Sequence, residues 1–389
     1  VAWRISEEKF FGKREWLNSL KLRASYGAVG NSAIDPYQTI AGLSKYDYLF
    51  GEDASNKFFA YRPSMIPNKD LGWEISRTAN FGVDFGLWNN RISGYIEGYI
   101  TKTSDLLMER TLPFFTGFSK VWQNIGKTEN KGIELNIQAN TLKTKSFSWE
   151  TTVTFARNWN KITELLGGGD IRNNSWFIGK PLQVHYNYEM IGVWQLGEEK
   201  EAQKYGAIPG DIKVKDQNND GSIGELDKVI LGQKDPKIIA SLLNSFRFGA
   251  FDASINLNMN FGSLIHPNTY ASLITRDGLR WMPSNFKYWT PDNPTNEYTR
   301  ADKLSGYDPF AGTGGYMKGD YIKIQDITLG YDFSKIMPKN WKILRARLYA
   351  QVRNLGYIYK ACKNDVSPEA PDFDYNIPTT YTMGINIDF

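Results

Sequence analysis

The segment from Asp216 to Asp227 has the residue types and spacing of a calcium-binding loop. Oxygen-bearing side chains occupy positions 1, 3 and 5, a glycine occupies position 6 and a carboxylate occupies position 12. Two departures weaken the match, because Gly224 at position 9 would need a water ligand and Asp227 is shorter than the usual bidentate Glu. A plain polar turn is the alternative. The sequence predicts a structural Ca²⁺ site within residues 209–232 of a long extracellular loop, with Asp216, Asn218, Asp220, Ser222 and Asp227 as ligands.

Aromatic residues are clustered in several long segments of the chain. Flat rings beside Asn, Asp and Arg can stack on the faces of sugars while the polar groups bind hydroxyls. The same rings could instead pack the segments against one another or against a partner protein. The candidate substrate or partner contacts are Trp176, Tyr186, Tyr188, Trp194, Trp281, Tyr288 and Trp289.

Catalytic chemistry finds little support in the composition. One Cys can form neither a disulfide framework nor a thiolate metal cluster, and the two histidines, His185 and His266, are far apart in the sequence. The motifs of serine hydrolases, zinc peptidases, P-loop enzymes and dinucleotide-binding enzymes are missing from the sequence. A net charge of +4 without a basic run does not indicate a nucleic-acid-binding surface. We expect no enzyme, no required cofactor and no nucleic-acid partner.

The elements that carry these segments are predicted to be strands, because apolar and polar residues alternate many times. In residues 252–261 the odd positions are apolar and the even positions are Asp, Ser or Asn. Residues 133–140 and 381–389 alternate in the same way. Similar runs lie at 20–26, 78–87, 91–102, 147–160, 237–248, 321–333 and 345–354.

Strand length and connection length together indicate a membrane β-barrel. Most of these runs approach the roughly 10 residues that a tilted strand needs to cross a bilayer, whereas strands of soluble proteins average about five or six. Short turns alternate with long connections, as on the two rims of an outer-membrane barrel. No 18-residue window is predominantly apolar, so no transmembrane helix is predicted. The long connections span residues 27–74, 103–130, 161–236, 262–319 and 355–379.

We therefore predict an all-β fold, the C-terminal portion of a large transmembrane β-barrel with about ten antiparallel strands, long extracellular loops and short periplasmic turns. About ten strands cannot close a wide barrel, and an open edge in lipid would leave backbone groups unsatisfied. Residues 1–389 are thus expected to belong to a longer barrel, without its first strands. Side chains expected to line the interior are Lys21, Arg23, Glu97, Glu134, Arg345, Arg347 and Arg353.

Short motifs spread along the chain resemble, in order, those of one known family. Residues 16–27 followed by Gly30-Asn31 look like a strand and loop opening of that family, and Asn68-Lys-Asp-Leu-Gly-Trp-Glu74 resembles its Asn-x-x-Leu-x-Trp-Glu strand entry. Further matching blocks are 130–135, 209–212, 289–294, 319–331 and 381–389. The chain closely resembles the C-terminal barrel half of a SusC/RagA-type TonB-dependent outer-membrane transporter of Bacteroidota.

The resemblance implies active import of a nutrient, most often an oligosaccharide or other glycan product, by the barrel of a SusCD-like transporter in the outer membrane. By the same resemblance, residues 1–389 are expected to lack the family's signal, its plug and its first barrel strands, and the interior charges are expected to line the lumen or touch the plug. Implied partners are a SusD-like surface lipoprotein over the long loops, the TonB complex acting through the missing N-terminal part, and a glycan or peptide substrate. The terminal Phe389 looks like the signal read by the outer-membrane assembly machinery. The alternatives are a passive porin or adhesin barrel and a soluble carbohydrate-binding β-protein.

Overall fold

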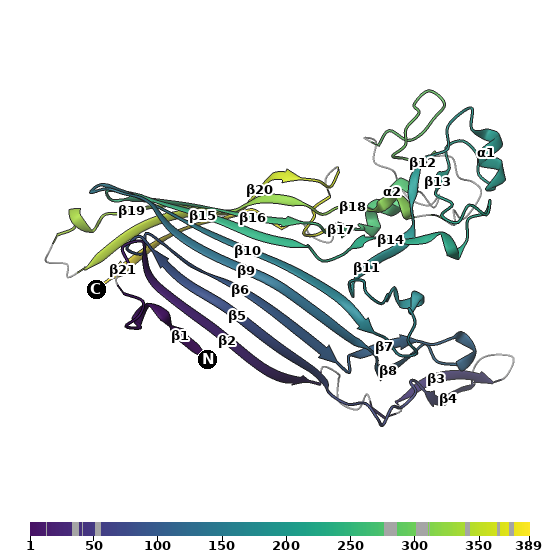
Figure 1. Cartoon of the computed structure of the whole chain (residues 1–389). Helices are drawn as coiled ribbons and strands as arrows, with labels where there is room; N and C mark the ends of the chain where they lie inside the picture. The colour runs from purple at the N-terminus through teal and green to yellow at the C-terminus, as the bar shows by residue number, and fades with distance from the viewer. Residues whose placement is uncertain are drawn as a thin grey trace.

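A computed structural model gives the fold of the chain. It describes residues 1–389 except 13, 33–38, 41, 51–55, 276–285, 301–309, 311, 339–342, 364–365 and 373–376. Its main element is one antiparallel sheet of eleven strands, in which strands next to each other in the sheet are also successive along the chain (Figure 1). The strands, in sheet order, are β1 (Ala2–Arg4), β2 (Leu17–Asn31), β5 (Glu74–Leu87), β6 (Ile92–Ser104), β9 (Lys127–Lys143), β10 (Phe147–Glu164), β15 (Ile238–Phe248), β16 (Phe251–Phe261), β19 (Tyr321–Asp332), β20 (Arg345–Lys360) and β21 (Thr380–Asp388).

The ten long strands of this sheet are the ten runs that alternation predicts. The sequence analysis missed the short strand β1, which pairs with β2 through Ala2, Trp3 and Arg4. Several predicted boundaries were too narrow. The strand β2 continues through Gly27 to Asn31, and β10 continues to Glu164, because the antiparallel ladder persists after the apolar alternation has ended.

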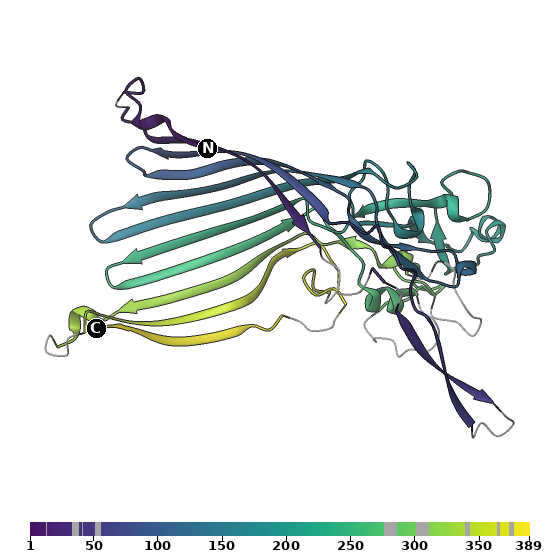
Figure 2. The same ribbon diagram turned by 90° about the horizontal axis from the view of Figure 1, so that it is seen from below.

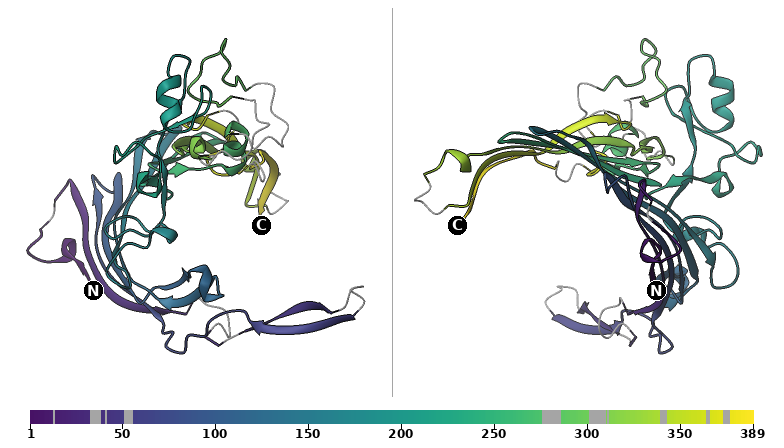
Figure 3. Two further views of the ribbon diagram at one scale, coloured as in Figure 1. Left: turned by 90° about the vertical axis from the view of Figure 1, so that its right-hand side faces the viewer. Right: turned by 60° about the vertical axis from the view of Figure 1, so that its left-hand side comes forward.

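The sheet is curved into an open trough with tight turns at one end and long connections at the other (Figures 2 and 3). The turn between β5 and β6 shows why it is tight, since Trp88, Asn89 and Asn90 all have φ between 50° and 57°. Asparagine tolerates this left-handed region better than most residues. The C-terminus lies at the end with the short turns (Figure 2).

The long connections contain small elements of their own. These are β3 (Leu43–Phe50), β4 (Asn56–Pro63), β7 (Leu107–Thr111), β8 (Lys120–Asn124), β11 (Val184–Tyr188), β12 (Met190–Val193), α1 (Glu199–Lys204), β13 (Ile212–Val214), β14 (Lys228–Gln233), β17 (Leu264–Ile265), α2 (Asn268–Thr275) and β18 (Met317–Lys318). The described parts of residues 165–237, 262–320 and 361–379 are called the loop assembly below. Neither α1 nor α2 has the length and apolar character needed to span a membrane, and the described residues contain no other α-helix.

The sheet has one apolar face and one polar face, as the register shows. Leu135 pairs with Ile96 on one side and Phe155 on the other, and the three lie on the apolar face. Near the short turns this face carries an apolar groove of about 340 Å³ whose lining includes Phe248, Phe251, Leu329, Tyr331 and Met383. The next residue on β9, Asn136, points to the polar face. The residues in register with it on the neighbouring strands are Tyr95, Thr154, Ser241 and Asn258.

One polar patch interrupts the apolar face. Asn244 Oδ1 accepts hydrogen bonds from Trp149 Nε1 at 2.9 Å and from Thr151 Oγ1 at 2.8 Å. Thr141 donates to Thr151 at 3.1 Å, which extends the patch to β9. Because these groups satisfy one another, the patch can lie on an apolar face at low cost.

Candidate functional site

The polar face of the sheet carries a network of ion pairs on β2, β5 and β6. Arg23 Nε lies 2.8 Å from Asp84 Oδ1, and its Nη2 lies 3.1 Å from Glu97 Oε2. Lys21 Nζ also contacts Asp84, at 3.2 Å. Alternation places these side chains on one face, as predicted, and the pairing of the strands then brings the opposite charges together.

A second group of charges lies on the polar face near the short turns. Arg347 Nε donates to Asp252 Oδ1 at 2.8 Å, and its guanidinium forms a second bond to the other carboxylate oxygen. Arg345 Nε lies 3.3 Å from Asp332 Oδ2. This bidentate pairing fixes the geometry of β16 against β20 across the intervening β19. Two other predicted interior residues have register partners on the polar face. Glu134 of β9 is opposite Glu97 of β6, and Arg353 of β20 is opposite Asp326 of β19.

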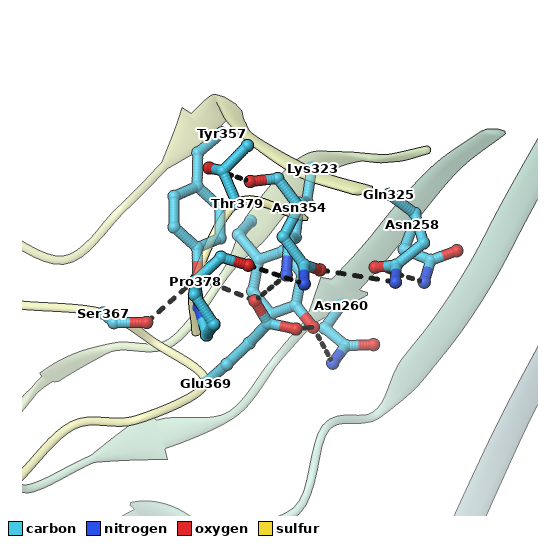
Figure 4. Close-up of polar contacts among 11 residues, drawn as sticks. Asn258, Asn260, Lys323, Gln325, Asn354, Tyr357, Ser367, Glu369, Pro378 and Thr379 are labelled. Atoms are coloured by element: carbon cyan, nitrogen blue, oxygen red, sulfur yellow. Dashed lines mark hydrogen bonds and ion pairs between the residues drawn. The ribbon is translucent and has the colours of Figure 1, made fainter. Parts of the chain in front are cut away.

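The connection between β20 and β21 folds back onto the polar face through Glu369 (Figure 4). Its Oε2 accepts from Lys323 Nζ at 2.7 Å and from Tyr357 OH at 2.7 Å, while its Oε1 accepts from Tyr321 OH at 3.3 Å. The Lys323 side chain is only 4% exposed. A buried ammonium requires a partner, so Glu369 holds this connection against the sheet. Sequence reasoning missed this contact, because Glu369 is 46 residues from Lys323.

The same part of the sheet carries a group of amide side chains, the amide ladder, beside Glu369 (Figure 4). Asn260 Nδ2 donates to Tyr321 OH at 2.8 Å, and Asn258 Nδ2 lies 3.3 Å from Gln325 Oε1. Asn354 Nδ2 reaches the carbonyl of Pro378 at 3.2 Å. The arrangement offers amide and hydroxyl groups for hydrogen bonding, the kind of surface that polar solutes can bind.

Trp194 and Trp289 both lie in a joint where two long connections contact each other. Each is 6% exposed. Trp289 Nε1 donates to Gln195 Oε1 at 2.8 Å, and Trp194 stacks on Tyr205 with ring centroids 6.0 Å apart. The Gly210 amide donates to the carbonyl of Trp194, and the Trp194 amide donates to the carbonyl of Asp211, so the block at residues 209–212 lies at this joint. A contact of either tryptophan with substrate stays a prediction.

An ion pair also links the two connections at this joint. Arg300 Nε lies 2.9 Å from Asp211 Oδ1, and the Arg300 amide donates to the carbonyl of Gly210 at 2.9 Å. Gly210 has φ of +90°, and an added Cβ would come within 2.6–2.8 Å of Arg300 and Trp289. Only glycine satisfies both the backbone conformation and the close approach.

The other predicted aromatic contacts occupy less buried positions. Tyr186 packs on Phe177 with ring centroids 4.7 Å apart, and Tyr188 meets Phe310 edge to face at 5.3 Å. Trp176 is half-buried, and Tyr288 packs beside Phe286 and Tyr298. Trp281 lies outside the described residues. These rings are spread over several elements of the loop assembly, so the structure does not gather the predicted set into one site.

The two histidines, far apart in sequence, lie close together in the structure. Their ring centroids are 6.4 Å apart, and Tyr316 contacts both, at 5.1 Å from His185 and 4.3 Å from His266. His185 Nε2 lies 2.9 Å from the carbonyl of Leu264, and His266 Nε2 lies 2.7 Å from that of Gly312. Burial lowers the pKa of His185 to about 4, with the positive charge of Lys234 adding to the effect. The cluster joins β11 to the segment around β17 and β18.

The predicted calcium loop is closed by its own hydrogen bonds. Asp216 accepts from the amides of Asn219 and Gly221 at 2.6 and 2.9 Å. Asp227, 1% exposed, accepts from the amides of Gln217 and Gly224 at 2.8 and 2.7 Å. Among the described residues, no group of three or more His, Cys, Asp or Glu side chains is arranged to hold a metal. Calcium binding by Asp216, Asn218, Asp220, Ser222 and Asp227 therefore stays a prediction.

Phe389 follows the last strand and is 82% exposed at the end of the sheet that carries the short turns. Its predicted role as an assembly signal is a matter of recognition by other proteins and stays a prediction.

Comparison with known proteins places the sheet and its loops in a family. The family model described as "TonB dependent receptor-like, beta-barrel" matches residues 10–355. The chain belongs to this TonB-dependent receptor β-barrel family. Proteins of this family are transporters rather than enzymes, and they are β-barrels of the outer membrane. The outer-membrane localisation predicted from the strands is therefore confirmed, and the soluble carbohydrate-binding alternative is wrong.

Individual TonB-dependent receptors are similar along the whole chain. "TonB-dependent receptor P26" of Formosa agariphila is 29% identical over 426 aligned residues, which cover 100% of this chain and 42% of the relative. "TonB-dependent receptor SusC" of Bacteroides thetaiotaomicron is 28% identical, covering 100% of this chain and 39% of SusC. The chain thus spans about two fifths of the length of these relatives. The predicted SusC/RagA-type resemblance is confirmed.

The fold is also that of a solved transporter. The structure titled "Structure of the RagAB peptide transporter" superposes with a TM-score of 0.79 at 23% identity, over 100% of this chain and 43% of that one. At this identity the likeness concerns the fold alone. It confirms that the open eleven-stranded sheet has the architecture of a partial TonB-dependent barrel.

Proposed function

We propose that this chain forms the C-terminal wall of a TonB-dependent transporter that imports a nutrient, an oligosaccharide in the first instance, across the outer membrane. The observation that carries the proposal is the continuous polar face of the sheet. It extends from Lys21 and Arg23 on β2 to Arg347 on β20, and the long connections lie at its outer end (Figure 1). A polar interior under long external loops suits the passage of a hydrophilic solute.

The relatives favour active import over a passive porin, because proteins named TonB-dependent receptors align with the whole of this chain. In this proposal TonB acts through an N-terminal part of the parent protein that lies outside residues 1–389. The chain supplies the wall against which such a part would move. The ion pairs of Arg23 with Asp84 and Glu97 and of Arg347 with Asp252 lie on the polar face that a plug would meet.

A SusD-like surface lipoprotein is the proposed partner on the rim formed by the loop assembly. Exposed or half-buried rings in the loop assembly, such as Trp176, Tyr186 and Tyr188, are the proposed contacts for a sugar or for this partner. For Trp194 and Trp289 we propose a structural role, because both are 6% exposed and engaged in the joint. A sugar could reach them only after the joint has opened.

Peptide import is the second candidate, since the solved RagAB protein is titled a peptide transporter. The amide ladder of Asn258, Asn260 and Asn354 can hydrogen-bond to a peptide backbone as well as to sugar hydroxyls. The two candidates differ in which solute enters the cell.

The test uses the complete parent protein in its own outer membrane. Cells with and without the gene are given fluorescently labelled oligosaccharides and, separately, labelled oligopeptides, and the label in the periplasm is measured with and without a protonophore. Energy-dependent, gene-dependent entry of the oligosaccharides supports the proposal, and entry of the peptides alone supports the second candidate. Gene-dependent entry that persists with the protonophore would instead indicate a passive porin.

A further inference from the structure

The apolar face of the sheet ends in a row of charged side chains near the long connections. Arg77 on β5, Lys102 on β6, Glu129 on β9 and Lys161 on β10 are register partners across four adjacent strands. Each lies on the face that carries the apolar residues, because each is separated from them by an even number of positions along its strand. Three of the four side chains in this row are basic.

Two further basic side chains lie on the same face, closer to the apolar residues. Lys131 is two residues from Glu129 on β9, and Arg157 is the register partner of Ile133. Lys131, Ile133 and Arg157 are all exposed. We call Arg77, Lys102, Lys131, Arg157 and Lys161 the outer basic row.

The outer basic row lies at the edge of the apolar band of the barrel, with Arg157 level with its last apolar residue and the other four beyond it. On β9 the apolar band extends from Ile133 to Leu142. Strands rise about 3.4 Å per residue and tilt by roughly 40°, so this stretch covers about 25 Å along the membrane normal, close to the height of a barrel's apolar band. The basic row is therefore at headgroup level, on the side of the long connections.

Carboxylates on this face do not neutralise the row. Glu129 Oε1 lies 3.0 Å from Lys131 Nζ and 3.2 Å from Lys161 Nζ, so one carboxylate is shared by two ammonium groups. Within the described part of the chain, no carboxylate is within ion-pair distance of Arg77, Lys102 or Arg157. Arg157 lies over the Trp159 ring instead, at 4.6 Å. Five basic groups thus face one shared carboxylate.

A groove of about 700 Å³ opens beside Arg77 and Lys102. Its lining includes Tyr26, the Glu129 carboxylate that is shared by Lys131 and Lys161, and Ala79 and Ile100, which are one row nearer the apolar band. Lys127 also lines the groove but is paired with Glu164 at 2.7 Å. The groove therefore combines two cations that have no carboxylate within ion-pair distance, Arg77 and Lys102, with the apolar side chains of Ala79 and Ile100 on the lipid-facing surface.

We propose that the outer basic row and this groove bind the phosphate group of an anionic lipid in the outer leaflet of the outer membrane. Arg77 and Lys102 contact the phosphate, since guanidinium and ammonium groups are the usual phosphate partners in proteins. The start of the acyl region lies on Ala79 and Ile100. Basic side chains beside a membrane attract anionic headgroups in this way, whereas solvated side chains that merely extend toward water would show no preference for phosphate.

The experiment uses the complete transporter purified in mild detergent. Binding of fluorescent diphosphoryl lipid A is titrated for the wild type, for Arg77→Gln/Lys102→Gln and for the control Lys200→Gln/Lys204→Gln. The control removes two exposed lysines of α1, an equal change of charge on the same side of the membrane. Folding of each variant is checked by heat-modifiable migration on a gel, and a Lys102→Arg variant retains the charge.

We expect the double variant of the row to bind diphosphoryl lipid A about tenfold more weakly than the wild type, with the control and Lys102→Arg unchanged. Wild-type protein should likewise lose about tenfold for a dephosphorylated lipid A, a comparison that needs no mutation. Equal affinity for the two lipids, or equal weakening by the control, would overturn the proposal. Competition by millimolar inorganic phosphate would also overturn it, because the site would then recognise a free anion rather than a lipid.

Discussion

The eleven-stranded sheet and the loop assembly at its outer end position their residues by different physical means. In the sheet, a residue's face follows from its parity along the strand, so Leu135 and Asn136 point to opposite sides whatever lies elsewhere in the chain. In the loop assembly, positions depend on contacts between distant segments, such as Trp289 with Gln195 and His185 with Tyr316. Local alternation therefore determines which face of the sheet a side chain occupies, and long-range contacts determine the positions of residues in the loop assembly.

The two regions also bury their side chains differently. Most of the smallest exposed fractions among apolar residues belong to the long connections, for example Val193, Ala202 and Val366 at 0–1%. Tyr270, Cys362 and Val366 form a small core there, with Phe286 and Tyr298 packed against it. Apolar residues of the sheet, such as Phe81 and Met383, remain 56% and 76% exposed. The wall is thus completed by lipid, whereas the loop assembly has an interior of its own.

The largest effect is expected in the joint of the loop assembly. Trp289→Ala removes a buried ring and the hydrogen bond to Gln195, which should destabilise the joint by about 3–5 kcal/mol. Limited proteolysis in intact outer membranes should then cleave the loop assembly faster, while heat-modifiable migration of the barrel is unchanged. Phe115→Ala, at a residue that is 88% exposed, is the matched control. Loss of the folded barrel in Trp289→Ala would contradict the separation of the two regions.

The next effect tests the lipid-facing side of the wall. Leu257→Arg places a charge on the apolar face of β16 and should weaken barrel folding by about 2–4 kcal/mol if the residue is near the bilayer midplane. Its neighbour supplies the control, because Asn256→Lys points to the polar face beside Asp326. Equilibrium unfolding in urea with lipid vesicles measures both variants. Equal loss in both would show that the two faces are not distinguished by the membrane.

An intermediate effect is expected where the two regions meet. Glu369→Gln leaves the buried Lys323 without its carboxylate and should loosen the β20–β21 connection by about 1–3 kcal/mol. Faster hydrogen exchange at residues 366–372 is the measurement. Tyr357→Phe removes one hydrogen bond to the same carboxylate and should cost only about 1 kcal/mol. If Glu369→Gln exchanged no faster than wild type, the connection would be held by other contacts.

A smaller effect concerns pH. The pKa of His185 is about 4 in the folded loop assembly and 6.5 for an ordinary exposed histidine, so an unfolded loop binds the proton first as the pH falls. Stability of the cluster with His266 and Tyr316 is therefore complete above pH 6.5 and declines between pH 6.5 and 4, by about 1 kcal/mol after allowance for partial exposure. Hydrogen exchange of β11 at pH 7.5 and 5 measures this decline. In His185→Gln it should vanish, and its persistence there would assign it to another group.

The smallest effect is that of calcium. If the loop from Asp216 to Asp227 binds Ca²⁺ with a weak affinity of about 10⁻³ M, then 10 mM CaCl₂ should stabilise this segment by about 1 kcal/mol. Protection from proteolysis within residues 209–232 is the measurement, with MgCl₂ as the control salt and Asp220→Ala as the control variant. Equal protection by both salts would leave the loop as a hydrogen-bonded turn.

The difference between the sheet and the loop assembly also explains which features could be predicted from the sequence. Alternation identified all ten long strands, because a strand with one apolar and one polar face repeats every two residues whatever its partner is. It also placed Arg23, Glu97 and Arg347 on the polar side, where the structure has them in ion pairs. Strand ends were less accurate, since beyond the bilayer the backbone pairing continues without an apolar pattern.

The loop assembly could not be predicted in this way. No local pattern indicates that Glu369 pairs with Lys323 or that the two histidines come together, because both contacts depend on how loops of different strands pack. For Trp194 and Trp289, residue type alone did not distinguish a ligand-binding ring from a buried one. The sequence feature that could have located the tryptophan joint is the Pro209-Gly210-Asp211 block. Its glycine adopts a positive φ inside the joint.

The measurement that most directly tests the two-faced wall is site-directed spin labelling of β16 in the complete protein, reconstituted in lipid. Residues 253–260 are replaced one at a time by Cys in a Cys362→Ser background and labelled, and collision with oxygen and with a nickel chelate is measured. Oxygen should be favoured at Ala253, Ile255, Leu257 and Met259, and the chelate at the even-numbered positions from 254 to 260. The same collision ratio at all eight positions, or a reversed alternation, would contradict the wall as described.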